Sequence, residues 1–302
     1  MPSEFFYWLL NMSISASIVG IIIFLLSKVR RIPRKIITLL WIVPFLRMWI
    51  PVGMNSEYSL MSLFSRFTTK TVPIYEGKAQ FSMMNHISLA DTYFPVAYKV
   101  NILEDVFKIA AIVWLVIAAA LIIAMLILYA VTKSELKDSR HMRDNIYISD
   151  KITSPAVYVI IREKIIISST YRNDDLKYIL IHEQAHIKRK DNLWRVVAIL
   201  TACVHWFNPL SWLFLKSFLA NIELACDEAV LKKCTDSEKK CYANTLLNCA
   251  ESKSLYASAF GGAKVRVRIE RILSYKKLST LSAIGFISLA VVVGYVLLTN
   301  AA

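Results

Sequence analysis

The sequence has few of the residues that build disulfide frameworks or thiolate metal sites. It contains five cysteines, an odd number, and no CxxC pair, which argues against disulfides and against a zinc site made of thiolates. It also lacks a Gly-rich signature, an RNA-recognition signature and a helix-turn-helix pattern, and it shows no internal repeat. The net charge of +14 therefore does not indicate direct binding to nucleic acid.

Apolar residues are abundant instead. They make up 56% of the 302 residues, and the mean hydropathy of +0.49 is too high for an ordinary soluble domain. A bilayer crossing needs about 20 apolar residues, and three runs are long enough: 5–26, 106–131 and 278–298. A fourth run, 36–50, is shorter and carries Pro44 and Arg47. The sequence thus predicts an α-helical integral membrane protein with about four transmembrane helices.

Basic residues set the expected orientation. The first run has neither a basic start nor a small-residue cleavage site, so we expect a retained helix rather than a signal peptide. The turn "KVRRIPRK" at 28–35 is typical of a cytoplasmic loop, and residues 132–279 hold 25 of the 36 Lys and Arg. We therefore expect a multi-pass protein of the cell membrane with an external loop at 51–105. Both termini should lie outside, with only a short external tail after the last helix in 278–302.

The segment 132–277 is the expected cytoplasmic domain. It opens with a charged linker, "TKSELKDSRHMRDN". Two β-branched runs follow, at 155–162 and 164–169, and they read as a pair of strands. The spacing of apolar residues then becomes helical from Asn173 or Asp174, either of which could cap the helix. An α+β domain is predicted.

The helix contains the stretch "ILIHEQAHIKRKD". Its two histidines, His182 and His186, are one turn apart on one face and can bind a single zinc ion. Glu183 is placed to act as the general base on a metal-bound water. The alternative is a solvated charged face that binds nothing, and a third ligand would decide between the two.

The candidate for that ligand lies in "NIELACDEAV", at 221–230. Glu223 could bind the metal while Asp227, one turn on, accepts a hydrogen bond from the remote nitrogen of a histidine. A plain surface pair is the alternative, and the neighbouring Glu228 favours it.

The apolar segment 196–219 separates the two motifs. If it crossed the membrane, Glu223 would lie on the side opposite to the histidines. Asn208-Pro209 predicts a break, because proline ends a helix and disfavours helical geometry in the preceding residue. Each arm is then too short to span, so we expect a hairpin that dips into the membrane and returns Glu223 to the histidines.

His205 and Asn208 flank this break. Either could contact substrate or stabilise an oxyanion. For His205 we favour the alternative of a buried histidine that is hydrogen-bonded to the backbone.

Four motifs in this order carry a resemblance to a known family: "ILIHEQAHIKRKDNLWR", "HWFNPLSWL", "NIELACDEAVL" and "YASAFGGAKVRVRIERIL", after the segment "SPAVYVIIREKIIIS". Together they resemble the BlaR/MecR family of antirepressor membrane metallopeptidases. The resemblance implies Zn²⁺ bound by His182, His186 and Glu223, with Glu183 as base and Asp227 as outer partner. It implies a gluzincin-like cytoplasmic domain that cleaves a transcriptional repressor in signalling such as antibiotic-resistance regulation.

The sequence departs from the family in one respect. Sensor members carry an external penicillin-binding domain after the last helix, and here we expect no such domain. A signal would come through the loop at 52–105, through a separate sensor protein, or be absent. Self-cleavage near 258–267 is the weaker expectation, because that glycine-containing segment also suits a flexible connection.

Two other functions remain open. One is a quality-control membrane metalloprotease of broad specificity. The other is a non-catalytic transmembrane regulator that holds a structural zinc. A structural site is usually closed by four protein ligands, whereas three are expected here, which favours a zinc metalloendopeptidase.

Overall fold

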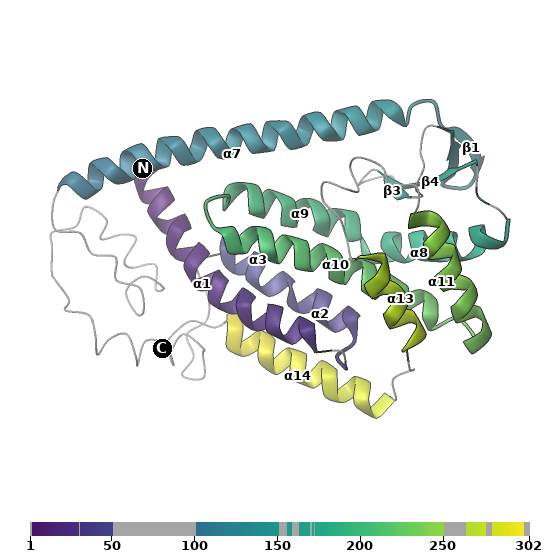
Figure 1. Cartoon of the computed structure of the whole chain (residues 1–302). Helices are drawn as coiled ribbons and strands as arrows, with labels where there is room; N and C mark the ends of the chain where they lie inside the picture. Colours follow the sequence, from purple (N-terminus) through teal and green to yellow (C-terminus); the bar gives the residue numbers. More distant parts are fainter. Residues whose placement is uncertain are drawn as a thin grey trace.

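The computed structural model describes residues 2–29, 31–50, 101–150, 156–158, 163–169, 171, 173–250, 264–275 and 280–298 (Figure 1). This part of the chain is mostly helical, with one small sheet at the end of the molecule where the long helix α7 stops. The expected external loop lies almost wholly outside the described residues, as does most of the segment considered for self-cleavage.

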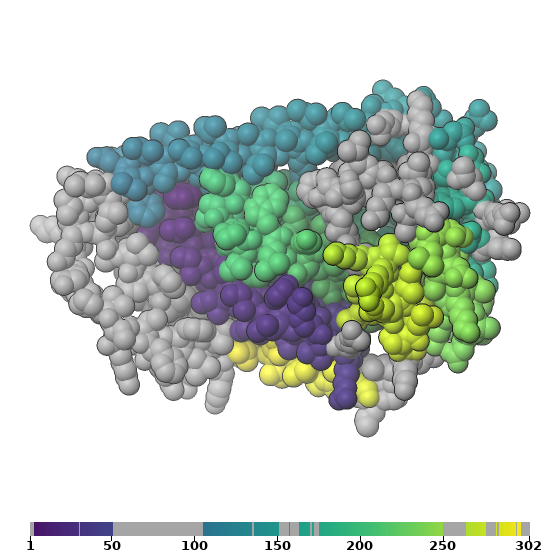
Figure 2. Space-filling view, in the orientation of Figure 1, coloured from purple at the N-terminus to yellow at the C-terminus, as the bar shows by residue number. Residues whose placement is uncertain are grey.

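Two described helices are long and apolar enough to cross a membrane. They are α1 (Pro2–Lys28) and α7 (Asn101–Glu135). In α1, 56% of the most apolar window is buried in the protein, against 17% in α7. Figure 2 shows α7 along one edge of the molecule. The third long run forms α14 (Thr280–Leu298). Its apolar stretch, Ile284–Val293, is shorter than those of α1 and α7.

The predicted helix over 36–50 is divided in two. It forms α2 (Arg34–Leu40) and α3 (Ile42–Trp49), with a turn at Trp41 between them. Pro44 explains the division: it has no N–H to donate to the carbonyl of Leu40, and its ring would clash with that carbonyl in a continuous helix. Proline is tolerated in the first turn of α3, where the N–H has no partner within the helix.

The sheet contains the expected strand pair and two further strands. The pair is β3 (Ala156–Tyr158) and β4 (Lys164–Ser168), which run antiparallel. The segment read as a charged linker contains β1 (Arg140–Arg143), and β2 (Ile146–Ser149) follows directly after that segment and pairs with β4 in parallel. The strand order is β1-β2-β4-β3, so β3 is an edge strand. Isoleucines of β4 pack against Ile179 of α8 (Asn173–Arg189), which fixes that helix on the sheet.

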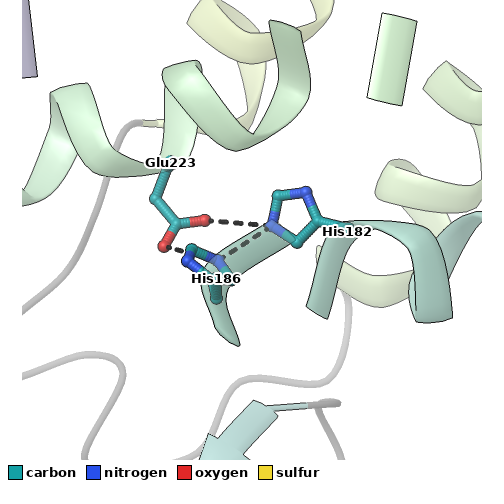
Figure 3. A group of neighbouring side chains, drawn as sticks. All are labelled: His182, His186 and Glu223. Atoms are coloured by element: carbon teal, nitrogen blue, oxygen red, sulfur yellow. Dashed lines mark hydrogen bonds and ion pairs between the residues drawn. The ribbon is translucent and has the colours of Figure 1, made fainter. Parts of the chain in front are cut away.

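The break expected at Asn208-Pro209 is present. Helix α9 (Asp191–Val204) and helix α10 (Pro209–Leu231) form a hairpin, and the Asn208 side chain accepts a hydrogen bond from Leu210 N at the start of α10. The amide of Asn208 donates to the hydroxyls of Ser13 (2.8 Å) and Ser17 (2.7 Å), near the middle of α1. The far part of α10 returns Glu223 to face α8 (Figure 3).

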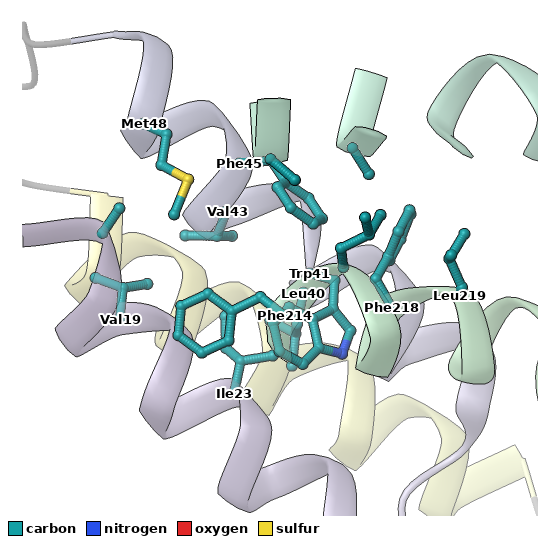
Figure 4. Close-up of a cluster of buried hydrophobic side chains, with 14 of the residues drawn as sticks. Val19, Ile23, Leu40, Trp41, Val43, Phe45, Met48, Phe214, Phe218 and Leu219 are labelled. Carbon is teal, nitrogen blue, oxygen red and sulfur yellow. The ribbon is translucent and has the colours of Figure 1, made fainter. Parts of the chain in front are cut away.

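The largest core joins this hairpin to α1, α2 and α3 (Figure 4). Phe214 of α10 contacts Trp41, with ring centroids 5.5 Å apart, and Phe218 meets Phe45 at 5.2 Å. A smaller core holds α8 and α10 against α11 (Asp236–Ala250) and α13 (Val265–Leu273). The helix that bears Glu223 therefore belongs to both cores.

Candidate metal centre

The two histidines of α8 meet as their spacing predicts. Their Nε2 atoms lie 3.2 Å apart, and the rings are nearly perpendicular. Both side chains are buried, with 6% of His182 and 4% of His186 exposed. At this distance the two nitrogens either share a proton in a hydrogen bond or, when both are unprotonated, can share a cation.

Glu223 completes a group of three donors (Figure 3). One carboxylate oxygen lies 3.6 Å from His182 Nε2, and the other lies 3.7 Å from His186 Nε2. Ligands at the usual zinc bond lengths and tetrahedral angles are about 3.3–3.5 Å apart. The donor set and its spacing therefore fit a zinc ion.

The Nδ1 atom of each histidine, which is the ring nitrogen that points away from the other donors, has a polar partner. His186 Nδ1 lies 2.8 Å from Asp191 Oδ2, and Asp191 is 2% exposed. His182 Nδ1 lies 3.0 Å from the Tyr242 hydroxyl, which donates to Asp227 Oδ1 at 2.6 Å. If each imidazole donates from Nδ1, its Nε2 lone pair faces the other donors, as metal binding requires.

Asp227 lies near His182, as the sequence suggested, but Tyr242 lies between the two side chains. Its Oδ1 is 3.4 Å from His182 Nδ1, and the Tyr242 hydroxyl is closer to that nitrogen. Asp227 is therefore an outer partner of His182 chiefly through Tyr242. Asp191 contacts His186 directly, a role that the sequence reasoning had not assigned.

Two arginines neutralise the carboxylates around the centre. Arg268 of α13 donates twice to Asp227, at 2.7 and 2.8 Å, and lies 3.3 Å from Glu223. Arg195 of α9 donates to the other oxygen of Glu223. Burial by itself would raise the pKa of Glu223, but the nearby histidines and these guanidinium groups hold that pKa well below its usual range. Glu223 is thus an anion at neutral pH.

Glu183 follows His182 on α8 and is 6% exposed. Within the described part of the chain it forms no hydrogen bond or ion pair. Its carboxylate is therefore free to bind a water molecule.

His205 and Asn208 lie elsewhere. Both are at the tip of the hairpin, and Glu223 is 15 residues along the chain from Asn208, about 20 Å at the rise of an α-helix. This separation places both side chains away from the three donors, and the suggested substrate or oxyanion role stays a prediction. His205 is fully buried, and Asn208 caps α10.

The residues that sequence reasoning missed are Asp191, Tyr242, Arg195 and Arg268. Asp191 ends the quoted stretch "HIKRKD", and its acidic side chain close to the second histidine was a usable signal. Arg268 lies in "RVRIER", a segment used only for the resemblance. Tyr242 carries no local signal, because it reaches His182 across 60 residues of sequence.

The fold and the site define a class: a mostly helical protein with two described helices long and apolar enough to cross a membrane and a His-His-Glu group that could hold a metal ion. The family model described as BlaR1 peptidase M56 matches residues 7–274. The chain belongs to this family.

Three curated relatives are similar over part of their length. The regulatory protein BlaR1 of Bacillus licheniformis is 31% identical over 167 residues, which cover 52% of this chain and 28% of the relative. The methicillin resistance mecR1 protein of Staphylococcus aureus (strain Mu50) is 26% identical over 110 residues, 35% of this chain and 19% of the relative. The regulatory protein BlaR1 of Staphylococcus aureus is 25% identical over 138 residues, with coverage of 43% and 23%. The matched segments thus cover less than a third of each relative.

Proposed function

We propose that this protein is a membrane-embedded zinc metalloendopeptidase that cleaves a cytoplasmic, repressor-like protein in signalling of the antibiotic-resistance type. The observation that carries the proposal is the convergence of His182, His186 and Glu223, with Glu183 beside them. The names of the relatives, which are regulatory and methicillin-resistance proteins, support the signalling role.

Each residue of the candidate metal centre has its own role in the proposed peptide hydrolysis. A zinc ion held by His182, His186 and Glu223 would supply a Lewis acid and lower the pKa of a water molecule. Glu183 takes the proton from the attacking water and then passes it to the nitrogen of the leaving amine. Asp191 and Tyr242 hold the imidazoles in the tautomer that leaves Nε2 unprotonated.

The edge strand β3 suits an extended substrate. Among the described strands it pairs with β4 alone, and β4 precedes the helix that carries the histidines. A peptide that adds to this sheet as a further strand would be held by main-chain hydrogen bonds beside α8.

The proposed topology places the metal centre in the cytoplasm and both termini outside. The supporting observation is the concentration of Lys and Arg in the turn at 28–35 and in residues 132–279. In this arrangement the tip of the α9–α10 hairpin, bound to the middle of α1, lies within the bilayer.

The test is zinc stoichiometry together with proteolysis, on the full chain purified in detergent. Wild type and Glu183→Gln are expected to hold about one zinc, and Glu223→Ala to lose it. Only wild type should cleave protein. If Glu223→Ala binds zinc as well as wild type, the third ligand is misassigned.

The same material separates the two competing functions. A broad-specificity protease cleaves unrelated unfolded proteins such as denatured casein, whereas a signalling protease cleaves few targets. If Glu183→Gln retains zinc and leaves cellular signalling unchanged, the protein is a regulator with a structural metal and the peptidase proposal fails.

A further inference from the structure

A large cavity lies where the membrane helices meet the domain that carries the metal centre. Its volume is about 1730 Å³, and its walls come from the α1–α2 turn, α10, α13 and the start of α14. These elements gather at one end of the molecule (Figures 1 and 2). Sites for small molecules are usually roughly 300–1,000 Å³, so this cavity suits a larger ligand. None of the three candidate metal ligands lines it.

Exposed cations face this cavity from two sides. Lys28, Arg31 and Lys35 come from the α1–α2 turn, while Lys188 and Lys232 come from the ends of α8 and α10. Within the described part of the chain none of these five forms an ion pair. An anion between the two sides would contact both the membrane region and the domain with the metal centre.

The carboxylates in the walls already have partners. Asp227 is held by Arg268, and Asp191 by His186 and Arg189. Glu228 accepts two hydrogen bonds from the backbone N–H of Arg34, and Glu270 pairs with Arg266. The cavity is therefore electropositive. Burial, followed by the charge of Arg271, lowers the pKa of Arg34 to about 10, although Glu228 opposes this shift.

Apolar side chains begin one helical turn away from the cations. Phe24 precedes Lys28 by four residues on α1, and the Lys28 ammonium lies over its ring, 4.6 Å from the centroid. Leu39 follows Lys35 by four residues on α2, a distance of about 6 Å along the helix. Leu39 is 62% exposed, and Ile287 of α14 is 56% exposed. The wall thus changes from charged to apolar in the direction in which α1 enters the membrane.

We propose that this cavity binds an anionic phospholipid of the cytoplasmic leaflet. The phosphate contacts Lys28 and Lys35 on one side and Lys188 and Lys232 on the other, while the acyl chains lie against Phe24, Leu39 and Ile287. Basic pockets between membrane helices on the cytoplasmic side suit lipid head groups of this kind. The inference rests on the proposed membrane orientation and is independent of the metal.

The test titrates the full chain in detergent with phosphatidylglycerol, with phosphatidylcholine and with inorganic phosphate, and counts bound molecules by native mass spectrometry. Phosphatidylglycerol is expected to bind to wild type at least tenfold more tightly than phosphatidylcholine, while inorganic phosphate does not compete. In Lys28→Gln/Lys35→Gln its affinity should fall about 30-fold, because each cation contributes about a factor of five.

The matched control is Lys133→Gln/Lys137→Gln, which removes the same charge at the end of α7, outside the cavity. It should bind phosphatidylglycerol as wild type does. Equal binding of the two lipids, an equal loss in the control, or full competition by inorganic phosphate overturns the proposal. If the first double variant fails to fold, Lys188→Gln/Lys232→Gln on the opposite wall gives the same readout.

Discussion

The two ends of the α9–α10 hairpin bury polar groups in different ways. At the base, Asp191 and Asp227 are buried charges and Glu223 is a partly buried one, and each meets a histidine or an arginine. At the tip, Asn208 is a neutral group whose amide bonds to serines of α1. Ionised groups need opposite charges or a metal when they leave water, whereas neutral groups need only hydrogen bonds. The base therefore holds the ionised groups around the candidate metal centre, whereas the tip holds a neutral side chain that joins the hairpin to α1.

The largest effect is expected from Glu183→Gln at the base. Proteolysis of the protein that wild type cleaves should slow about 10²- to 10⁴-fold, because the amide cannot accept the proton of water. Zinc content and melting temperature should stay as in wild type. The control, Asp236→Asn on the exposed start of α11, should retain the wild-type rate.

Arg268→Met tests the paired charges of the base. It leaves Asp227 and Glu223 without their shared cation, which should lower the free energy of unfolding by about 3–5 kcal/mol. Denaturant unfolding in detergent measures this change. Arg266→Met, two residues earlier on α13, removes an exposed pair with Glu270 and should change stability by less than about 1 kcal/mol. Equal losses in the two variants would contradict the assigned pairing.

Asp191→Asn tests the orientation of His186. Its zinc affinity should fall about 10- to 100-fold, because the amide holds the imidazole tautomer less well than the carboxylate does. Competition with a zinc chelator measures the affinity. Asp236→Asn, on the exposed start of α11, is the matched control and should bind zinc like wild type.

Asn208→Ala tests the tip and should have the smallest effect. The variant loses the cap of α10 and the bonds to α1, which should cost about 1–2 kcal/mol of stability. Zinc affinity should not change. A loss of zinc without a loss of stability would show that the tip takes part in the site and would remove the distinction between the two ends.

The sequence predicted the candidate donors more fully than it predicted their surroundings. His182 and His186 share a helical face by spacing alone, and Asn208-Pro209 indicated that the chain returns Glu223 to them. Tyr242 and Arg268 come from distant helices, so only tertiary packing brings them to the site. The substrate or oxyanion role suggested for His205 and Asn208 stays a prediction. Both side chains lie at the end of α10 far from Glu223, since nearness in sequence to a predicted bend does not measure distance along a helix.

The secondary structure, too, could be predicted from the sequence only in part. The paired strands were expected from their β-branched residues, whereas β1 was not, because its four residues, "RHMR", are exposed and show no alternation. The division of 36–50 into two helices follows from Pro44, which was noted in the sequence but not used to place a break.

Helix α10 runs without interruption from the tip, bound to α1, to Glu223 at the base. A rod of about 20 Å converts a tilt of roughly 3° into a shift of about 1 Å at its far end, and a misplacement of about 1 Å can slow an enzyme about 100-fold. The aromatic packing of Phe214 and Phe218 lies between these two points of α10, so its loss would let the helix tilt and would move Glu223 relative to the histidines.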